Sequence, residues 1–492
     1  MRPVNPRRIS IGTTLVILIA LCAGGCGPWP DGKPQCADEG EACTEDSDCC
    51  ANLFCSEEGA CVAEGGGEGE GEGEGEGEGE PPGELVRSEK ARVDSPAVPE
   101  GDLVELVAGD SAFAFDLYQQ VRDEDGNIFY SPHSISIALA MTYAGARNEA
   151  ERQMAGTLHF TLPQDRLHPV FNALDLELAS RSEDDPDTDE QGFTLNIVNR
   201  IWGQVGFFFL DEFLDVLAEN YGAGLSLLDF ARAAEESRLV INDWVSDQTE
   251  NRIEDLIPEG QITRFTRLVL TNAIYFNAAW AKPFDEDATR DEPFYLLDGS
   301  QVTAEMMHQV ESFGYAAGDG YQAVELRYED QPLSMVLFLP DAGRFDEFDA
   351  VLDSALVETM LQDLEYRTLN LTVPKFTFEW DMAMGSVLAA MGMPIAFDSL
   401  NADFSGMNGV GPGDPSGQWL YISEVIHKAF VAVDEEGTEA AAATAVIIGE
   451  GAAPEPEEPL AVTIDRPFVF LIRDIETGAI LFVGRVVDPS AS

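Results

Sequence analysis

Residues Asp434 to Pro459 read "DEEGTEAAAATAVIIGEGAAPEPEEP", a stretch with four consecutive alanines and no lysine or arginine. Alanine is the best helix former. A helix here would carry alanine on every side, between Gly437 and Gly449, so it would have no apolar stripe to face a core. Loops longer than about 12 to 15 residues without structure of their own are usually functional or disordered. The rest of the sequence decides between these two interpretations.

Composition and charge limit the partners of this chain. Its 492 residues suffice for one large domain or for two to three ordinary ones. The formal net charge is -62, from 28 basic and 90 acidic side chains. Such a field repels nucleic acid, anionic membranes and sulfated polysaccharides. We therefore expect no nucleic acid and no heparin-like polysaccharide among its partners.

The N-terminus has the pattern of an export signal. Three arginines precede a short apolar run and then small residues, which predicts a signal peptide over residues 1–25. The segment Ala23-Gly24-Gly25-Cys26 resembles a bacterial lipobox, which implies lipidation of Cys26 and a lipid-anchored start over 26–35. Ala23 stands where leucine is usual, so ordinary cleavage that leaves Cys26 free is the alternative. We expect an exported protein, either an outer-membrane or cell-surface lipoprotein or a secreted one, that meets the membrane only through this anchor.

Six cysteines follow within residues 36–61, and none comes after them. Twenty-six residues cannot bury a useful core, so disulfides must supply the stability of this module. The spacing C-x6-C-x5-C-C-x4-C-x5-C resembles that of cystine-knot (knottin) modules. The resemblance implies the pairs Cys36–Cys50, Cys43–Cys55 and Cys49–Cys61. A zinc site is the competing interpretation, but an oxidising compartment and the lack of histidine here disfavour it.

The next segment has the composition of a linker. From Glu64 to Glu80 the chain reads "EGGGEGEGEGEGEGEGE", and two prolines follow. Glycine removes stiffness and like charges resist collapse, which predicts an extended flexible tether. We assign residues 62–100 to this linker and residues 101–492 to the main domain.

The main domain has both helical and strand patterns. Residues 110–123 and 131–147 have apolar residues at helical spacing, and Pro132 suits a first helical turn. Strand-like apolar runs follow at 193–204, 267–280, 332–340, 369–380 and 466–474. Helices first and strands later indicate an α+β fold.

The sequence contains no common catalytic motif. It has five histidines and lacks the patterns H-E-x-x-H, G-x-S-x-G, Walker A and G-x-G-x-x-G. We therefore expect no enzyme, no cofactor and no bound metal. An unrecognised hydrolase is the alternative, because catalytic triads are spatial.

Several longer motifs resemble one family. "HKAFVAVDEEGTEAAAATA" resembles the hinge of serpins, and "VTIDRPFVFLI" resembles their C-terminal signature. "NIFYSPHSISIAL", "INDWVSDQTENRIEDLI" and "LVLTNAIYFNAAWAKPFD" are similar to further serpin blocks, so the resemblance covers about residues 100 to 490. It implies a large central β-sheet, further sheets, about nine helices and an exposed reactive loop. It also implies a monomeric suicide-substrate inhibitor that a target serine protease attacks, giving a covalent acyl complex.

In this family the cleaved loop enters the central sheet as an added strand, and alternate residues of that strand face the buried side. After Glu435 and Gly437, the buried set is small and uncharged at first: Thr438, Ala440, Ala442 and Thr444, then Val446 and Ile448. Small side chains insert without overpacking, and uncharged ones without burying a charge. Proline would delete a hydrogen bond of a central strand, and the first proline after Glu435 is Pro454.

The usual family spacing from Glu435 places the scissile bond at Gly451–Ala452. Glu450–Gly451, Ile448–Gly449 and Ala452–Ala453 remain alternatives, because the loop is longer than in compact members. Insertion from Thr438 to Gly451 would drag an attached protease roughly 45 Å. Residues 431–465 contain no lysine, arginine, methionine or aromatic residue. Elastase-like or subtilisin-like targets therefore fit best, and a glutamate-preferring protease comes second.

The resemblance also implies two control regions in the sheet. One is a shutter cluster that governs sheet opening, formed by Ser131, Ser134, Asn272 and His427. The other is the breach, where insertion begins, at Trp280 and Glu435. Alignment places Thr303 opposite Glu435, where many members have a basic residue, so a salt bridge at the breach is doubtful.

Two further functions compete with protease inhibition. A non-inhibitory serpin would act as a binding or storage protein, although such members usually have bulky, charged or proline residues in the hinge. Alternatively, the cystine-knot-like module carries a binding role and the large domain is a passenger.

Overall fold

The computed structural model describes residues 53–55, 61–63, 83–182, 194–249, 251–329, 331–438 and 458–491. The chain divides into two compact units, residues 1–79 and 80–492. In the first unit the strands β1 (Leu53–Cys55) and β2 (Cys61–Ala63) pair antiparallel. The predicted signal peptide, Cys26, most of the cysteine module and the linker up to residue 82 lie outside the described residues.

The second unit contains a seven-stranded sheet, which we call the central sheet. Its strand order is β13-β14-β15-β7-β5-β6-β3. The bounds in that order are β13 (Phe376–Ala383), β14 (Ile422–Val433), β15 (Gly437–Thr438), β7 (Leu268–Ala279), β5 (Thr194–Gln204), β6 (Leu225–Leu228) and β3 (Glu84–Val86).

A nine-stranded sheet forms the other main layer. Its path is β16-β12-β9-β10-β11-β17-β18-β4, and β8 pairs with β9 beside this path. The bounds are β16 (Leu460–Thr463), β12 (Glu365–Pro374), β9 (Gln301–Gly318), β10 (Tyr321–Arg327), β11 (Leu333–Pro340), β17 (Phe468–Asp474), β18 (Ile480–Val486), β4 (Ile128–Tyr130) and β8 (Arg290–Tyr295).

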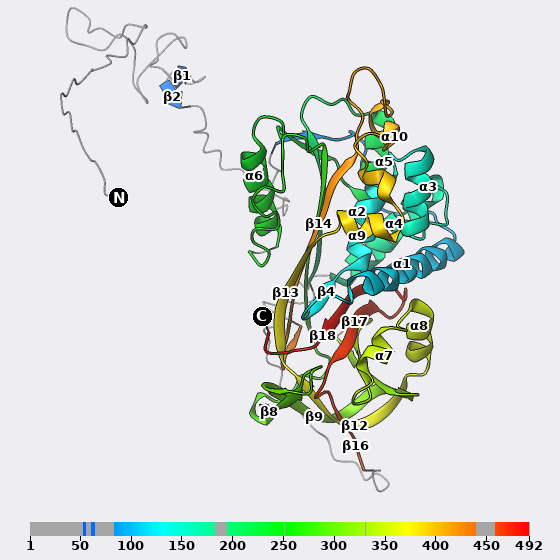
Figure 1. Ribbon diagram of the computed structural model, residues 1–492, viewed down its shortest axis with the longest axis vertical. Coiled ribbons are helices and arrows are strands. Elements are labelled where there is room, and N and C mark those ends of the chain that lie inside the picture. Colours follow the sequence, from blue (N-terminus) through cyan, green and yellow to red (C-terminus); the bar gives the residue numbers. More distant parts are fainter. Residues whose placement is uncertain are drawn as a thin grey trace, which may run out of the picture. The chain divides into compact units, whose positions relative to one another are not determined.

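Ten α-helices lie in the described part of the chain, where the sequence predicted about nine. They are α1 (Glu100–Val121), α2 (Pro132–Tyr143), α3 (Asn148–Thr157), α4 (Gln164–Ala179), α5 (Asp211–Tyr221), α6 (Ala234–Gln248), α7 (Phe345–Asp349), α8 (Ser354–Gln362), α9 (Gly385–Met391) and α10 (Ser405–Asn408). Most helices gather on one side of the central sheet, and α6 lies on the other side (Figure 1). None of the described helices has the length and apolarity that a membrane span requires.

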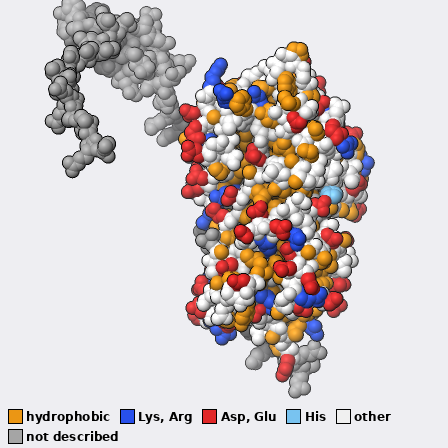
Figure 2. All heavy atoms as spheres, viewed as in Figure 1, with side chains coloured by type: hydrophobic (Ala, Val, Ile, Leu, Met, Phe, Trp, Pro, Cys, Tyr) orange, Lys and Arg blue, Asp and Glu red, His pale blue; other side chains and the backbone are white. Residues whose placement is uncertain are grey.

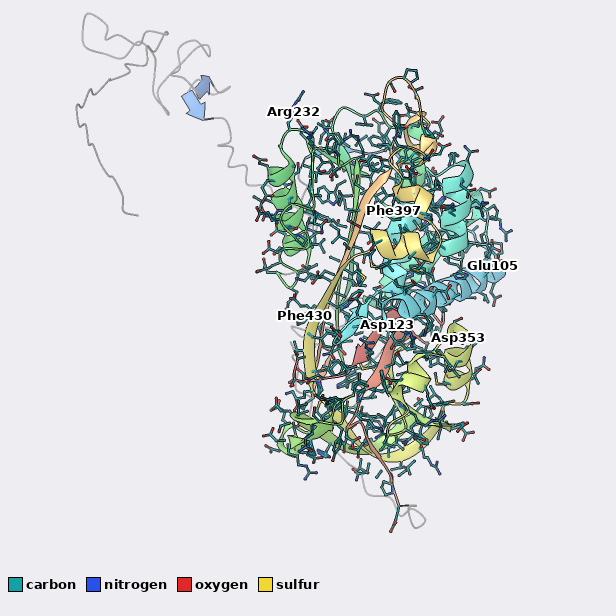
Figure 3. All side chains as sticks on the ribbon, viewed as in Figure 1. Glu105, Asp123, Arg232, Asp353, Phe397 and Phe430 are labelled. Carbon is teal, nitrogen blue, oxygen red and sulfur yellow. The ribbon has the colours of Figure 1, made fainter. Side chains whose placement is uncertain are left out.

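Apolar residues fill both faces of the central sheet. On one face the main core joins the sheet to the helices and to the nine-stranded sheet. On the other face a smaller cluster packs α6 against the sheet, with Trp202, Trp244, Val269 and Ile426 among its buried members. In Figure 3 the labelled Phe430 lies on β14, and the labelled Phe397 lies in the helical layer beside it. A strand added to this sheet would therefore be covered on the face of the main core, and on the other face only where α6 packs.

The α+β prediction is confirmed, and the five predicted strand runs all form strands. The run at 369–380 divides at Lys375: β12 belongs to the nine-stranded sheet and β13 to the central sheet. The sequence analysis placed residues 83–100 in the linker. In the structure these residues pack on the large unit, since β3 forms the edge of the central sheet and α1 begins at Glu100.

Candidate functional site

The predicted hinge begins where β14 ends at Val433. The Asp434 side chain accepts hydrogen bonds from the backbone N–H groups of Glu436 (3.0 Å) and Gly437 (3.2 Å), which closes a tight turn. After this turn β15 lies between β14 and β7, with Thr438 opposite Val433 on one side and Ala278 on the other. The hinge therefore already forms the first two residues of an additional strand in the central sheet.

The two residues of β15 fit a narrow space. A Cβ atom on Gly437 would lie 2.2 Å from the Ala278 carbonyl oxygen, so only glycine fits there. Thr438 is 1% exposed, and its hydroxyl hydrogen-bonds the Tyr328 hydroxyl at 2.8 Å. The sequence analysis placed Thr438 first in the buried set, and its side chain is buried. Ala440, Ala442, Thr444 and the proposed reactive bond at Gly451 and Ala452 lie outside the described residues.

Trp280 lies against the hinge, as the breach assignment required. Its ring stacks on Tyr328, with ring centroids 4.7 Å apart. Its indole N–H donates to the Asp434 carbonyl oxygen at 3.0 Å, and its backbone N–H donates to the Glu436 carbonyl oxygen at 2.8 Å. The two hydrogen bonds fix the turn from which β15 starts.

The breach contains a salt bridge that the sequence analysis doubted. Glu435 is 5% exposed, and its carboxylate lies 2.7 Å from the Lys375 ammonium group. The Thr289 hydroxyl donates to the same carboxylate at 2.6 Å. Burial alone would raise the pKa of Glu435, but the hydrogen bonds from Lys375 and Thr289 outweigh it and lower that pKa. The carboxylate is therefore charged, paired and buried.

The alignment with Thr303 was wrong, because Thr303 lies in β9 opposite Pro293 of β8. Lys375 reaches Glu435 because it occupies the point where the chain leaves one sheet and enters the other. The available sequence signal was the pair Pro374-Lys375, a proline and a cation within an apolar run. Sequence spacing alone does not show that this cation meets a residue sixty positions later.

The four predicted shutter residues lie together beneath the sheet. The Ser131 backbone N–H donates to His427 Nε2 at 3.3 Å, so the proton of this neutral ring is on Nδ1 and is donated to Asn272 Oδ1. The Asn272 amide donates to the Ser134 hydroxyl and, at 2.5 Å, to Asn199 Oδ1. Ser131 also caps α2, since its hydroxyl accepts the Ser134 N–H at 3.1 Å. Sequence reasoning missed Asn199.

This cluster crosses the line along which β7 and β14 pair directly, which we call the seam. The seam joins Leu268–Ile274 to Ile422–Ala429, and His427 lies opposite Asn272 in its register. Burial lowers the pKa of His427 to about 3, so its imidazole is neutral near pH 7. The seam is thus held by a neutral hydrogen-bonded pair of side chains as well as by its backbone ladder.

No group of histidine, cysteine, aspartate or glutamate among the described residues is arranged to hold a metal ion. What the site offers is a sheet with a short strand already started between β7 and β14, above a seam that still joins them. Such a site defines a protein whose central sheet holds a two-residue hinge strand between two long strands.

Comparison with known proteins agrees with this class. The serpin (serine protease inhibitor) family model matches residues 108–489, so the chain belongs to the serpin family. A leukocyte elastase inhibitor of Xenopus tropicalis is 39% identical over 77% of this chain and 97% of its own length. An uncharacterized serpin-like protein of Thermococcus kodakarensis is 38% identical over 79% of this chain and 87% of its own length.

Solved structures share the fold as well. The native state of the thermophilic serpin tengpin has a TM-score of 0.70 and 28% identity, over 81% of this chain and 97% of that one. Human thyroxine-binding globulin in complex with its ligand has a TM-score of 0.68 and 29% identity, over 79% of this chain and all of that one. The similar proteins therefore include elastase inhibitors and a thyroxine-binding globulin.

Proposed function

We propose that this protein is a suicide-substrate inhibitor of serine proteases. The observation that carries the proposal is β15, because the hinge already occupies the position between β7 and β14 from which insertion would continue. The small, uncharged residues that follow it in the sequence support the same conclusion. The similarity to leukocyte elastase inhibitors is further support.

The antiparallel register of β15 with β7 predicts where each inserted residue would lie. Thr438 lies opposite Ala278, so continued pairing places Thr444 opposite Asn272 and Ile448 opposite Leu268. Thr444 would then arrive between Asn272 and His427. Insertion must therefore break the side-chain bond that closes the seam and replace the backbone pairs of β7 with β14.

The same register is compatible with the proposed reactive bond. β7 begins at Leu268, so a strand that matches its length ends at Ile448. The bond Gly451–Ala452 follows shortly after this end, and Glu450–Gly451 and Ala452–Ala453 are close alternatives. A cut at Ile448–Gly449 would leave a strand that ends with the sheet.

Trapping is a competition between two rates. The protease serine attacks the scissile carbonyl carbon, the peptide bond breaks, and the protease is left as an ester on the new C-terminus of the loop. If this loop inserts before water hydrolyses the ester, the protease is carried along the sheet. The inhibitor supplies no catalytic group, and its contribution is the free energy released by insertion.

We infer that the target is elastase-like or subtilisin-like. A trypsin-like pocket would leave its buried carboxylate unpaired, because residues 431–465 offer no lysine or arginine. We further propose export to the cell surface. The lipid anchor would be at Cys26, and the disulfide-bonded module would hold the inhibitor away from the cell surface. Figure 2 shows acidic side chains over the face in view, which agrees with repulsion from anionic surfaces.

Incubation with a panel of serine proteases tests the proposal. We expect a complex with an elastase-like or subtilisin-like enzyme that survives boiling in detergent, and a released peptide that begins after one of residues 448–452. Mass spectrometry of that peptide identifies the reactive bond. Rapid cleavage without any stable complex, for every protease that cuts the loop, would show a non-inhibitory serpin.

A further inference from the structure

Residues 83–93, which we call the strap, dock on the edge of the central sheet. Their first part forms β3, which pairs antiparallel with β6, with Leu85 opposite Ser226. The Val86 side chain packs against the main core. The strap is drawn in blue in Figure 1 and runs from β6 towards α5. The edge of the central sheet is therefore closed by a segment that precedes the domain in sequence.

Beyond β3 the strap binds two helices. The Lys90 ammonium group lies 3.1 Å from Asp215 and 2.8 Å from Glu219, both on α5. The Arg92 guanidinium group lies 2.5 Å from Asp175 on α4. These contacts connect one short segment to β6, α5 and α4 at the same time.

The strongest evidence for a specific binding surface under the strap is Asn172 of α4, whose side chain is completely buried. Its Oδ1 accepts from Arg92 Nε at 2.7 Å, and its Nδ2 donates to the Val93 carbonyl oxygen at 2.7 Å. Without the strap the oxygen would lose this partner and the nitrogen would keep only a longer bond of 3.4 Å to Glu219. A buried polar group that loses its partner costs about 1–3 kcal/mol.

The surface under the strap requires a glycine at position 224. A Cβ atom on Gly224 would lie 2.7 Å from the Val86 carbonyl oxygen and 2.8 Å from the Arg87 Cβ atom. Gly224 directly precedes β6, so any larger residue there pushes against the strap. A substitution at Gly224 therefore displaces the strap without changing the sequence of the strap.

We infer that the strap is a conformational lock on the central sheet. An inserted strand widens the sheet by about 4.8 Å between β7 and β14. The strands on the β7 side must then move relative to the strands on the other side or to the helices beneath them. The strap ties β6 to α4 and α5, so movement of β6 relative to these helices breaks strap contacts. It thus favours the closed sheet and slows insertion of an uncut loop.

This inference rests on the proposed function for its effect on inhibition, but its structural part is separately measurable. The test uses the full chain with Arg92→Glu, which opposes Asp175 and leaves Asn172 Oδ1 without its donor, and with Gly224→Val, which displaces the strap. Arg87→Glu is the matched control, because Arg87 is an exposed arginine of the same segment. Hydrogen exchange of β6 and α5 shows whether the strap is released.

The second measurement is the rate at which warmed, uncut protein loses protease-trapping activity and becomes heat-resistant. We expect this rate to rise about ten-fold or more in Arg92→Glu and Gly224→Val, from the cost of the lost charge-assisted bond. Arg87→Glu should resemble the unaltered protein. Faster exchange with an unchanged conversion rate would overturn the lock, and so would unchanged exchange in both variants. If the unaltered protein traps no protease, the proposed function fails, while heat resistance and exchange still test the lock.

Discussion

Thr438 shows how much a single side chain decides in this molecule. It is buried at the start of the additional strand, with its hydroxyl on Tyr328. In the proposed insertion each later residue pairs beyond Thr438, so the strand extends only while Thr438 keeps its place between β14 and β7. The side chains that fit at this buried position are therefore those that would permit insertion.

Thr438→Arg should turn the inhibitor into a substrate. The arginine would have to bury an unpaired cation, so the loop would stay out after cleavage and the acyl-enzyme would be hydrolysed. We expect the amount of inhibitor consumed per protease molecule to rise by about ten-fold or more, measured by titration against active enzyme. Thr438→Ser, which keeps the hydroxyl, is the control. Stoichiometric stable complexes with the arginine variant would contradict the insertion argument.

Lys375 should contribute much more to stability than an exposed cation does. In Lys375→Ala the buried Glu435 carboxylate loses its cation, and we expect the free energy of unfolding in urea to fall by about 3 kcal/mol. Lys282→Ala is the control, because the Lys282–Glu311 pair is exposed and a loss below about 1 kcal/mol is expected. Equal losses in the two variants would show that the breach pair is not special.

At the scale of elements, the seam between β7 and β14 is the part of the sheet that would have to open for the proposed insertion. Its register places His427 opposite Asn272, so the neutral side-chain bond and the backbone ladder lie at the same level. The hinge strand β15 lies between β14 and β7 beyond one end of the seam. The strap pairs with β6 at the outer edge of the sheet. The elements that we propose to control insertion are thus short segments paired with longer strands.

The seam should weaken in acid because of His427. Its pKa is about 3 in the folded protein and near 6.5 when exposed, so the unfolded state binds a proton between these pH values that the folded state excludes. The free energy of unfolding therefore decreases as pH falls through this window, by at most about 1.4 kcal/mol per pH unit for one proton.

His427→Gln removes the titrating imidazole but keeps an amide that can accept and donate hydrogen bonds. We expect a shallower pH dependence of the unfolding free energy between pH 6 and 4 than in the unaltered protein. His159→Asn is the control, since His159 lies at the surface beside Asp116. The same slope in all three proteins would mean that His427 is not the seam's acid-sensitive group.

At the scale of the whole molecule, the two faces of the central sheet explain why insertion would release free energy. The helices and the nine-stranded sheet cover one face, and α6 covers one end of the other (Figure 1). A strand inserted between β7 and β14 would gain backbone partners on both sides and bury its inward-facing side chains against the main core. On the proposed mechanism, a native state in which β7 still pairs with β14 would be less stable than one with the loop inserted between them.

The cut protein should therefore melt at a higher temperature than the intact one. After cleavage within residues 439–457, verified by mass spectrometry, we expect the melting temperature in calorimetry to rise by about 10 °C or more. A chain with Thr438→Arg, cut at the same bond, should not show this gain. Equal melting temperatures of cut and intact unaltered protein would exclude a metastable native state.

The sequence was most informative where short motifs have local meaning. Pro132 predicted the first turn of α2, and the five apolar runs predicted strands, because helix starts and strand patterns depend on neighbours in the chain. The four shutter residues and Trp280 of the breach were assigned from motif resemblance. The structure brings the shutter residues together and places Trp280 against the hinge. The doubt about a salt bridge at the breach was wrong, because alignment placed Thr303 opposite Glu435 and the structure pairs Glu435 with Lys375.

By itself the sequence determined the α+β class, the family resemblance and the small, uncharged character of the hinge, since these depend on residue types and their spacing. Only the tertiary structure decided that Glu435 meets Lys375, that β15 has begun its strand, and that residues 83–93 belong to the sheet. The physical reason is that burial and pairing between segments far apart in the chain are set by packing. Residues 83–93 are charged and follow a glycine-rich repeat, so the sequence places them in the linker until the surface that they contact is known.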